Sequence, residues 1–98
     1  MASHDEYLAI IRRIPKGKVA TYKDIARIAN NPDGAMSVGD ALKKHKHAPG
    51  LPWWRVVKAG GKLADGAPDD QRRLLADEGV SCDAWGRLNL RLYQWREP

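Results

Sequence analysis

The chain has 98 residues, of which 43% are hydrophobic and 30% are charged, and this composition is typical of a soluble globular protein rather than a disordered one. This length accommodates one modest core, so we expect residues 1–98 to form a single domain. No apolar run approaches the roughly 20 residues that cross a bilayer. The acidic N-terminus also lacks the apolar stretch of a signal peptide. The lone cysteine, Cys82, excludes an internal disulfide, so we expect a reducing, cytoplasmic compartment. We also expect a monomer that has no membrane association and is associated with the nucleoid.

Positive charge is concentrated in the middle of the chain, although the net charge is only +5. The stretch from Arg12 to Lys62 holds 12 of the 17 basic residues but only 3 of the 12 acidic ones. A basic surface of this kind favours a polyanionic partner, and DNA is the usual one. The alternative is an ordinary lysine-rich surface in contact with solvent.

Two helix starts carry the same capping signature. Ser3 is followed three residues later by Glu6, and Thr21 is followed by Asp24, so a hydroxyl and a carboxylate can satisfy free amide groups of the first turn. Isoleucines at helical spacing supply a buried face after each cap, and Pro15 stops the first helix. Residues 17–20 are expected to form a short connector, extended in part.

A third helix is expected from about Pro32 to Lys46, with Asn31 as its N-cap. Its short connection to the second helix predicts a helix-turn-helix arrangement. The first turns of this helix are rich in small residues, namely Gly34, Ala35, Ser37, Val38 and Gly39. Each glycine costs a helix about 1 kcal/mol relative to alanine. Two explanations remain open: the helix enters a minor groove about 6 Å wide, or it packs tightly on its partner helix.

The second half of the chain is expected to contain less helix. Residues 49–52 break the chain before a bulky apolar run, and Gly60-Gly61 forms a turn. Asp69 and Asp70 begin the last predicted helix, where carboxylates favour the positive end of the helix dipole. Residues 88–93 alternate in polarity, which predicts a strand or an extended tail. The fold class is therefore mostly α with minor β.

The motifs resemble, in order along the chain, those of the O6-alkylguanine-DNA alkyltransferases. Residues 14–22 resemble the entry to their DNA-binding domain, residues 31–42 their recognition helix, and residues 52–57 their active-site run, Pro-Cys-His-Arg-Val. Residues 88–98 resemble the shorter alkyltransferase-like proteins, in which tryptophan replaces the reactive cysteine. The resemblance covers nearly the whole chain and implies a winged-helix-like domain of the alkyltransferase C-terminal type.

The resemblance also implies a function and a set of site residues. Members bind double-stranded DNA through the minor groove and rotate an alkylated guanine into a pocket, and alkyltransferase-like proteins pass the lesion to nucleotide excision repair proteins. Tyr22 matches the tyrosine that helps to rotate the target nucleotide, and Trp53 replaces the nucleophile. The expected DNA-binding residues are Thr21, Tyr22, Gly34, Ala35, Met36, Ser37, Gly39, Lys43 and Lys44. The expected lesion pocket consists of Tyr22, Leu42, Pro52, Trp53 and Val56.

Three departures from the family pattern bear on lesion recognition. The family's intercalating arginine finger falls at Met36, which can separate bases as an apolar wedge but cannot hydrogen-bond the orphaned cytosine. The histidine after the cysteine is replaced by Trp54. The loop from Gly61 to Pro68 is short and lacks a basic residue that we expect to line the pocket. A DNA-binding or architectural module without preference for alkylguanine is therefore the alternative function.

The sequence predicts a protein that is not an enzyme. Alkyl transfer needs a thiolate and an imidazole that takes the thiol proton, and the indoles of Trp53 and Trp54 supply neither. We expect Trp53 to line the pocket and Trp54 to pack against the protein. Cys82 has no neighbouring histidine and is more simply a small buried hydrophobe, although a residual transferase or hydrolase is the third hypothesis.

No cofactor or metal is expected. His45 and His47 lie two positions apart on a helix and point in different directions, so they make a poor metal site. Solvated or phosphate-contacting histidines are the simpler interpretation. Without an imidazole relay, Glu78 is expected to serve as a structural carboxylate.

Overall fold

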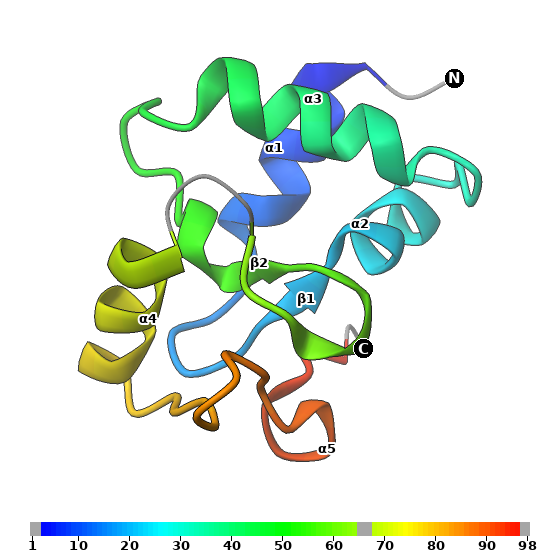
Figure 1. Ribbon diagram of the computed structural model, residues 1–98. Coiled ribbons are helices and arrows are strands. Elements are labelled where there is room, and N and C mark those ends of the chain that lie inside the picture. Colours follow the sequence, from blue (N-terminus) through cyan, green and yellow to red (C-terminus); the bar gives the residue numbers. More distant parts are fainter. Residues whose placement is uncertain (1–2, 65–67, 97–98) are drawn as a thin grey trace.

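The structure is a computed structural model that describes residues 3–64 and 68–96 (Figure 1). Its elements in chain order are α1 (His4–Arg12), β1 (Ala20–Thr21), α2 (Tyr22–Ile28), α3 (Ala35–His45), η1 (Trp53–Arg55), β2 (Val56–Val57), η2 (Ala59–Gly61), α4 (Pro68–Asp77) and α5 (Leu90–Tyr93). The short sheet lies between the three N-terminal helices and the C-terminal half of the chain. None of the helices in the described residues is long and apolar enough to cross a membrane.

Both predicted helix starts form with a hydroxyl cap, and the second also forms the complete capping box. The Ser3 hydroxyl accepts the Glu6 amide N–H at 3.3 Å, and the Thr21 hydroxyl accepts that of Asp24 at 3.0 Å. The Asp24 carboxylate accepts the Thr21 amide N–H in return at 3.1 Å, which completes a capping box at the start of α2. The apolar sides of α1, α2 and α3 then enclose the larger of two cores. The helix-turn-helix arrangement of α2 and α3 is confirmed.

The predicted start of α3 is wrong by three residues. The helix begins at Ala35 with Gly34 as its N-cap, and no side chain caps it. The Asn31 side chain turns toward α1 instead, where its N–H₂ group donates to the Tyr7 hydroxyl at 2.9 Å, and its backbone carbonyl accepts the Gly34 amide N–H at 2.9 Å. Asn30 adopts a left-handed conformation with φ 60°, so the chain turns here before the helix starts. The Asn31-Pro32 signal therefore marks a turn that is fastened to α1.

We expect Gly34→Ala to lower the free energy of unfolding by about 1–3 kcal/mol, the usual cost of overpacking a tight site. A Cβ atom at Gly34 would lie 2.5 Å from the Asn31 side-chain nitrogen and 2.7 Å from the Tyr7 hydroxyl. Gly39→Ala is the matched control because its Cβ would meet nothing within 4 Å. Inside the helix, this control should stabilise the protein by about 0.5–1 kcal/mol. Urea denaturation measures both, and equal midpoints for the two variants would contradict the packing role of Gly34.

The sheet joins the two cores. Strands β1 and β2 run parallel, with Ala20 opposite Val56 and Thr21 opposite Val57. Because alternate strand residues face opposite sides, Ala20 and Val56 pack in the helical core, whereas Val57 packs in a second core. That second core also contains Val19, Leu75, Val80 and Leu88. The sheet therefore fixes the position of the C-terminal half relative to the helix-turn-helix.

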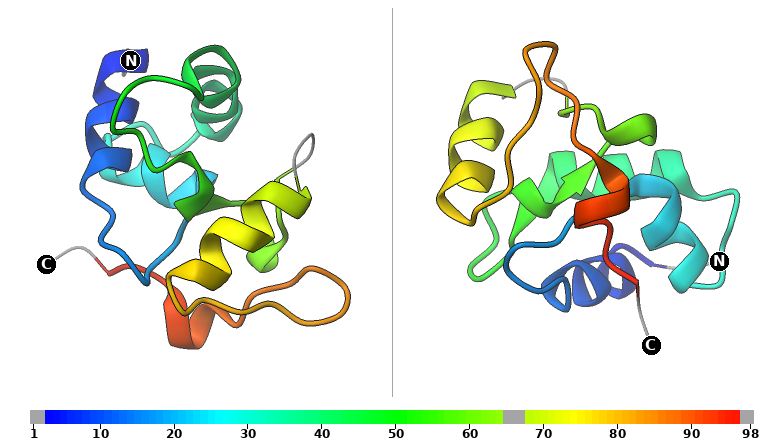
Figure 2. Two further views of the ribbon diagram at one scale, coloured as in Figure 1. Left: turned by 90° about the vertical axis from the view of Figure 1, so that its left-hand side faces the viewer. Right: turned by 90° about the horizontal axis from the view of Figure 1, so that it is seen from below.

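The C-terminal segment differs from the expected strand or extended tail. Within residues 88–93, Leu88 alone takes part in a β-bridge, with Cys82, and Leu90–Tyr93 form the short helix α5; the next residue, Gln94, bridges to Val19. Asn89 caps this helix, with its side-chain oxygen accepting the Arg91 amide N–H at 3.0 Å. The alternating leucines resembled a strand, but the Asn89 cap starts a helical turn. The segment from Cys82 to Leu88 projects from the body of the molecule as a turn (Figure 2).

Candidate nucleic-acid interface

A cavity of about 470 Å³ lies between α3 and the chain that follows the sheet. Its walls include Tyr22, Leu42, Trp53 and Val56, so the structure brings together four of the five residues predicted for a lesion pocket. Pro52, the fifth, is buried and is not among the described lining residues. It shapes the backbone before η1 instead of forming a wall. The role of the four lining residues in holding a base stays a prediction.

Local structure explains why these side chains converge. Tyr22 is the first residue of α2 and follows the capping box directly, so its backbone is fixed. The other side of the cavity is held by Gln71 of α4, which is fully buried. The Gln71 side-chain nitrogen donates to the carbonyls of Trp54 and Val56 at 3.0 and 2.8 Å, and its side-chain oxygen accepts the Ala64 amide N–H at 2.7 Å. This single glutamine ties the Trp53 segment to the far wall.

Lysines line the cavity as well. The Lys46 ammonium lies 4.1 Å from the ring centroid of Trp53, a cation–π contact. Lys43 and Lys58 also line the cavity. Sequence reasoning assigned Gly39, Lys43 and Lys46 to DNA rather than to the cavity wall, and it missed Lys58 and Ala64 altogether. The i, i+3 spacing of Lys43 and Lys46 could have placed both on one helix face, whereas no local signal marked Lys58 or Ala64.

The residues of α3 and its N-cap that were predicted to contact DNA differ in their exposure to solvent. Met36 is 86% exposed, and Lys43 and Lys44 are exposed. Gly39 is half-buried, and no atom lies within 4 Å of the position where a Cβ would stand, so another backbone can approach here. Gly34 is different because it is buried and packs against α1. Tight packing therefore explains Gly34, whereas entry of Gly39 into a minor groove stays a prediction.

Thr21 also differs from the prediction. Its side chain is buried, and its hydroxyl accepts the N–H of Asp24 in the capping box. The structure therefore gives Thr21 the task of starting α2, not that of presenting a hydroxyl to DNA. Ala35 and Ser37 are half-buried in the first turn of α3, and their contact with DNA stays a prediction.

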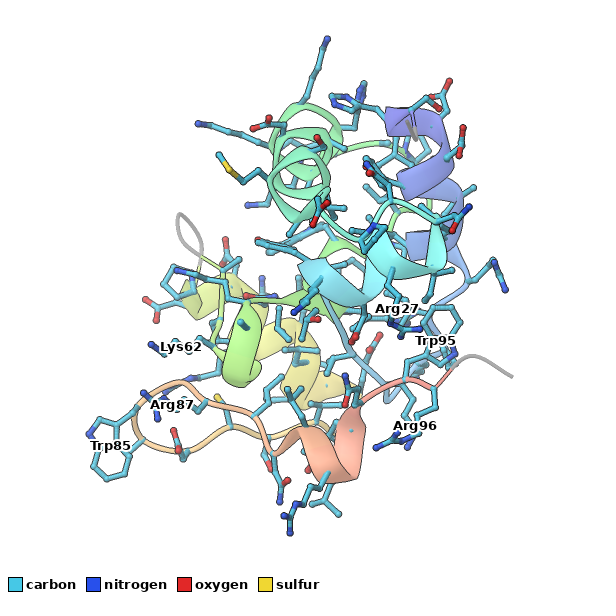
Figure 3. All side chains as sticks on the ribbon, turned by 90° about the vertical axis from the view of Figure 1, so that its right-hand side faces the viewer. Arg27, Lys62, Trp85, Arg87, Trp95 and Arg96 are labelled. Atoms are coloured by element: carbon cyan, nitrogen blue, oxygen red, sulfur yellow. The ribbon has the colours of Figure 1, made fainter. Side chains whose placement is uncertain are left out.

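Positive charge is not confined to one face of the molecule. Arg27 and Arg96 lie near Trp95, on the side opposite Lys62 and Arg87 (Figure 3). The Arg13 guanidinium also lies over the Trp95 ring, 5.9 Å from its centroid. Basic residues that lie close together in the middle of the sequence therefore lie on two sides of the folded protein.

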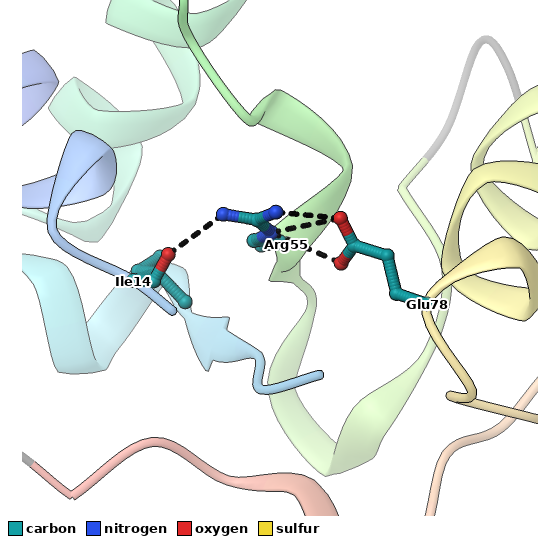
Figure 4. Close-up of polar contacts among 3 residues, drawn as sticks. All are labelled: Ile14, Arg55 and Glu78. Carbon is teal, nitrogen blue, oxygen red and sulfur yellow. Dashed lines mark hydrogen bonds and ion pairs between the residues drawn. The ribbon is translucent and has the colours of Figure 1, made fainter. Parts of the chain in front are cut away.

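Arg55 links Glu78 to the backbone carbonyl of Ile14 (Figure 4), and its guanidinium lies 5.5 Å from the ring centroid of Trp54. The Arg55 side chain donates to Glu78 through Nε at 3.0 Å and to the Ile14 carbonyl through Nη1 at 2.8 Å. The Trp54 ring packs edge-on against Trp53, with centroids 6.2 Å apart. Trp54 thus packs against the protein while Trp53 lines the cavity, in line with the expectation for the two tryptophans.

The Glu78 carboxyl has a pKa below its ordinary value. Burial alone would raise this pKa, but hydrogen bonds from Arg55 and Trp54, the charge of Arg55 and the backbone N–H of Gly17 together outweigh it. The buried Trp54 N–H finds no acceptor with full hydrogen-bond geometry in the described residues, yet it lies close enough to favour the charged carboxylate. Glu78 is therefore an ion-pair partner of Arg55.

The cysteine and the histidine of α3 pack against other parts of the protein. Cys82 is half-buried against the second core and forms a β-bridge with Leu88, as expected of a small hydrophobe. The His45 ring meets the His4 ring edge-on at 5.8 Å. Among residues 3–64 and 68–96, no group of three histidine, cysteine or acidic side chains could hold a metal ion. The predicted shortening of the 61–68 loop concerns residues 65–67, which lie outside the described residues.

A helix-turn-helix whose second helix carries exposed lysines beside a cavity defines a DNA-binding domain. The family model described as the DNA-binding domain of 6-O-methylguanine DNA methyltransferase matches residues 2–80. The chain belongs to this family, and within it to the alkyltransferase-like, or DNA base-flipping, proteins. The predicted family and fold class are confirmed: a mostly helical domain with a small two-stranded sheet, of the alkyltransferase C-terminal type.

Relatives cover nearly the whole chain. A DNA base-flipping protein of Vibrio parahaemolyticus is 39% identical over 93 residues, which are 93% of each chain. Alkyltransferase-like protein 1 of Schizosaccharomyces pombe is 36% identical over 91 residues, which are 85% of this chain and 84% of that protein. The crystal structure of S. pombe Atl1 with damaged DNA containing O6-carboxymethylguanine matches with a TM-score of 0.88 at 30% identity, over 99% of this chain and 100% of that one.

Proposed function

We propose that this protein is a non-enzymatic sensor of DNA damage, folded as one domain over residues 1–98. It binds double-stranded DNA through the minor groove, holds an extruded O6-alkylguanine in the cavity beside Trp53, and leaves the base unrepaired for nucleotide excision repair proteins. The observation that carries this proposal is the cavity next to α3, walled by Tyr22, Leu42, Trp53 and Val56. The crystal structure of the similar S. pombe protein with damaged DNA supports it.

The cavity suits a flat, partly apolar ligand. Its volume of about 470 Å³ lies within the range of small-ligand pockets, roughly 300–1,000 Å³. Two aromatic side chains supply surfaces on which a base can stack, and Leu42 and Val56 supply apolar contacts for an alkyl group. Extruding a base costs a few kcal/mol, and these contacts offset that cost only when the base is inserted.

Helix α3 has the surface that a minor groove requires. Gly39 lets the backbone approach closely, and Ala35 and Ser37 are small. Met36 stands clear of the protein and can separate base pairs as an apolar wedge. Lys43 and Lys44 can contact phosphates, which adds affinity without sequence specificity.

Trp53→Cys should not create a methyltransferase. The new thiol would face a cavity in which the neighbouring residue is Trp54, whose N–H can only donate, so no imidazole takes the thiol proton. Incubation with DNA carrying a labelled methyl group measures the transfer, and label should stay on the DNA. Retention of label on the single variant would contradict the argument about proton removal, and label on the wild-type protein would restore the transferase hypothesis for Cys82.

Paired duplexes with and without O6-methylguanine test the proposed function. Each is titrated at two salt concentrations while tryptophan fluorescence is followed. A sensor binds the lesion more tightly, and base insertion beside Trp53 quenches the fluorescence. Because Met36 is an apolar wedge rather than a hydrogen-bonding finger, the alternative is an architectural module. Equal affinities for both duplexes with a steep salt slope would favour that alternative over the sensor.

A further inference from the structure

A second feature of the surface lies outside the cavity. Trp85, at the tip of the turn formed by residues 82–88, is 84% exposed. We call this segment the Trp85 turn. An indole with nearly all of its surface in water contributes little to folding, and exposed aromatic side chains beside cations are typical of binding surfaces.

The Trp85 turn is held in one conformation. The Asp83 carboxylate accepts the amide N–H groups of Trp85 and Arg87, each at 2.9 Å. The Gly86 carbonyl accepts the Leu63 amide N–H at 3.2 Å, and Lys62 pairs with Arg87 in an antiparallel bridge. Because these bonds fix the backbone, the tryptophan is presented to solvent with little ordering entropy left to lose on binding.

The side chains around Trp85 suit a phosphodiester. Lys62, Asp83, Trp85 and Arg87 line an open depression of about 620 Å³. Within the part of the chain that the structure describes, no ion pair engages Lys62 or Arg87. Asp83 Oδ1 accepts both amide N–H groups, which offsets part of the carboxylate's negative charge, and the Arg72 side chain, which donates to the Asp83 carbonyl at 3.4 Å, adds a further positive charge. This surface therefore combines two cationic side chains, Lys62 and Arg87, with the exposed aromatic ring of Trp85.

One short segment connects this depression to the cavity. Lys58 and Ala64 line the cavity, whereas Lys62, between them in sequence, lines the depression. Two residues of chain span at most about 7 Å, so the depression begins close to the cavity wall at Ala64. A duplex that places a nucleotide in the cavity therefore brings its flanking backbone within reach of the Trp85 turn.

We infer that the Trp85 turn, together with Lys62, is a second DNA contact. Lys62 and Arg87 bind phosphates that flank the extruded nucleotide, and Trp85 packs on the adjacent deoxyribose. This inference rests on the proposed DNA-binding function but not on lesion preference. The depression adjoins the cavity proposed to hold a base, so DNA bound at the cavity would also reach the depression. This position favours DNA as the partner over an acidic protein segment.

The test uses the full chain with the double substitution Lys62→Ala and Arg87→Ala. Arg27→Ala with Arg96→Ala is the matched control because it removes the same charge from the opposite side of the molecule (Figure 3). The first pair should reduce the slope of log affinity against log salt by about 2, equally on normal and O6-methylguanine duplexes. The control should leave most of the slope intact.

Trp85 is tested separately. Trp85→Ala should weaken binding of both duplexes about tenfold, from lost apolar burial, and Trp85→Phe should retain most of the affinity. Thermal melting shows that each variant is folded. A slope for the Lys62/Arg87 variant equal to that of the control, or full DNA affinity in Trp85→Ala, would overturn the inference and leave a protein partner as the occupant. Absence of lesion preference in all variants would refute the sensor proposal alone, since the salt slopes on unmodified DNA still report on the turn.

Discussion

Replacement of Glu78 by alanine should cost about 3–5 kcal/mol of unfolding free energy, because it leaves the Arg55 guanidinium without its partner. The side chain of Arg55 is only 16% exposed and that of Glu78 only 8%. Arg55 would keep one hydrogen bond, to the Ile14 carbonyl. Since small domains are stable by about 5–15 kcal/mol, the variant should unfold at much lower denaturant concentration. Denaturation in urea at neutral pH measures the loss.

The double variant Arg55→Met with Glu78→Leu is the control for this prediction. Apolar side chains of similar volume avoid the unpaired buried charge, so the double variant should be more stable than Glu78→Ala. A double variant that is as unstable as Glu78→Ala would mean that packing, and not the lone charge, explains the loss.

The Glu78 pair should also make stability depend on acid. The pKa of Glu78 in the folded protein lies below the ordinary value of 4.5, so the folded state binds fewer protons than the unfolded state at mildly acid pH. The stabilisation is therefore complete above about pH 4.5 and is lost as the pH falls through the folded pKa. The stability difference between wild type and Glu78→Ala should shrink in acid. A constant difference from neutral pH downward would contradict this account.

The second large effect concerns lesion preference. Tyr22→Ala should lower the ratio of affinities for O6-methylguanine and unmodified duplexes by about tenfold, since stacking of a base on an aromatic ring contributes roughly 1–3 kcal/mol. Tyr22 lines the cavity, and under the proposed function its ring would contact an extruded base more than an intact duplex. Fluorescence titration of the two duplexes measures the ratio. Tyr22→Phe keeps the aromatic ring and is the control. Equal losses of affinity for the two duplexes in Tyr22→Ala would show that Tyr22 does not contribute to lesion preference.

Local signals predicted the parts of the fold that depend on a few neighbouring residues. The caps at Ser3 and Thr21 require only a hydroxyl and an amide three residues apart, and both formed, although only Thr21 completes the reciprocal capping box. The start of α3 could not be predicted in this way. The Asn31 side chain has a distant partner, Tyr7 on α1, and that contact competes with capping.

The candidate site was predictable where it followed the family pattern and not where it depended on tertiary contacts. Trp53 and Tyr22 were found because their motifs resemble those of alkyltransferases. Lys58 and Ala64 lie in a segment that Gln71 of α4 holds at Val56 and at Ala64 itself, and both line the cavity. No pattern of adjacent residues reveals such a long-range bond.

The far end of the described chain returns to Val19, the residue before β1. The Val19 amide N–H donates to the Tyr93 carbonyl at 2.8 Å, and the Val19 carbonyl accepts the Trp95 amide N–H at 2.7 Å. Gln94 also donates to the Asp24 carboxylate that caps α2, the helix carrying Tyr22. A substitution at Gln94 would therefore act on the cavity wall at Tyr22 through the Asp24 cap, without touching anything held in the cavity.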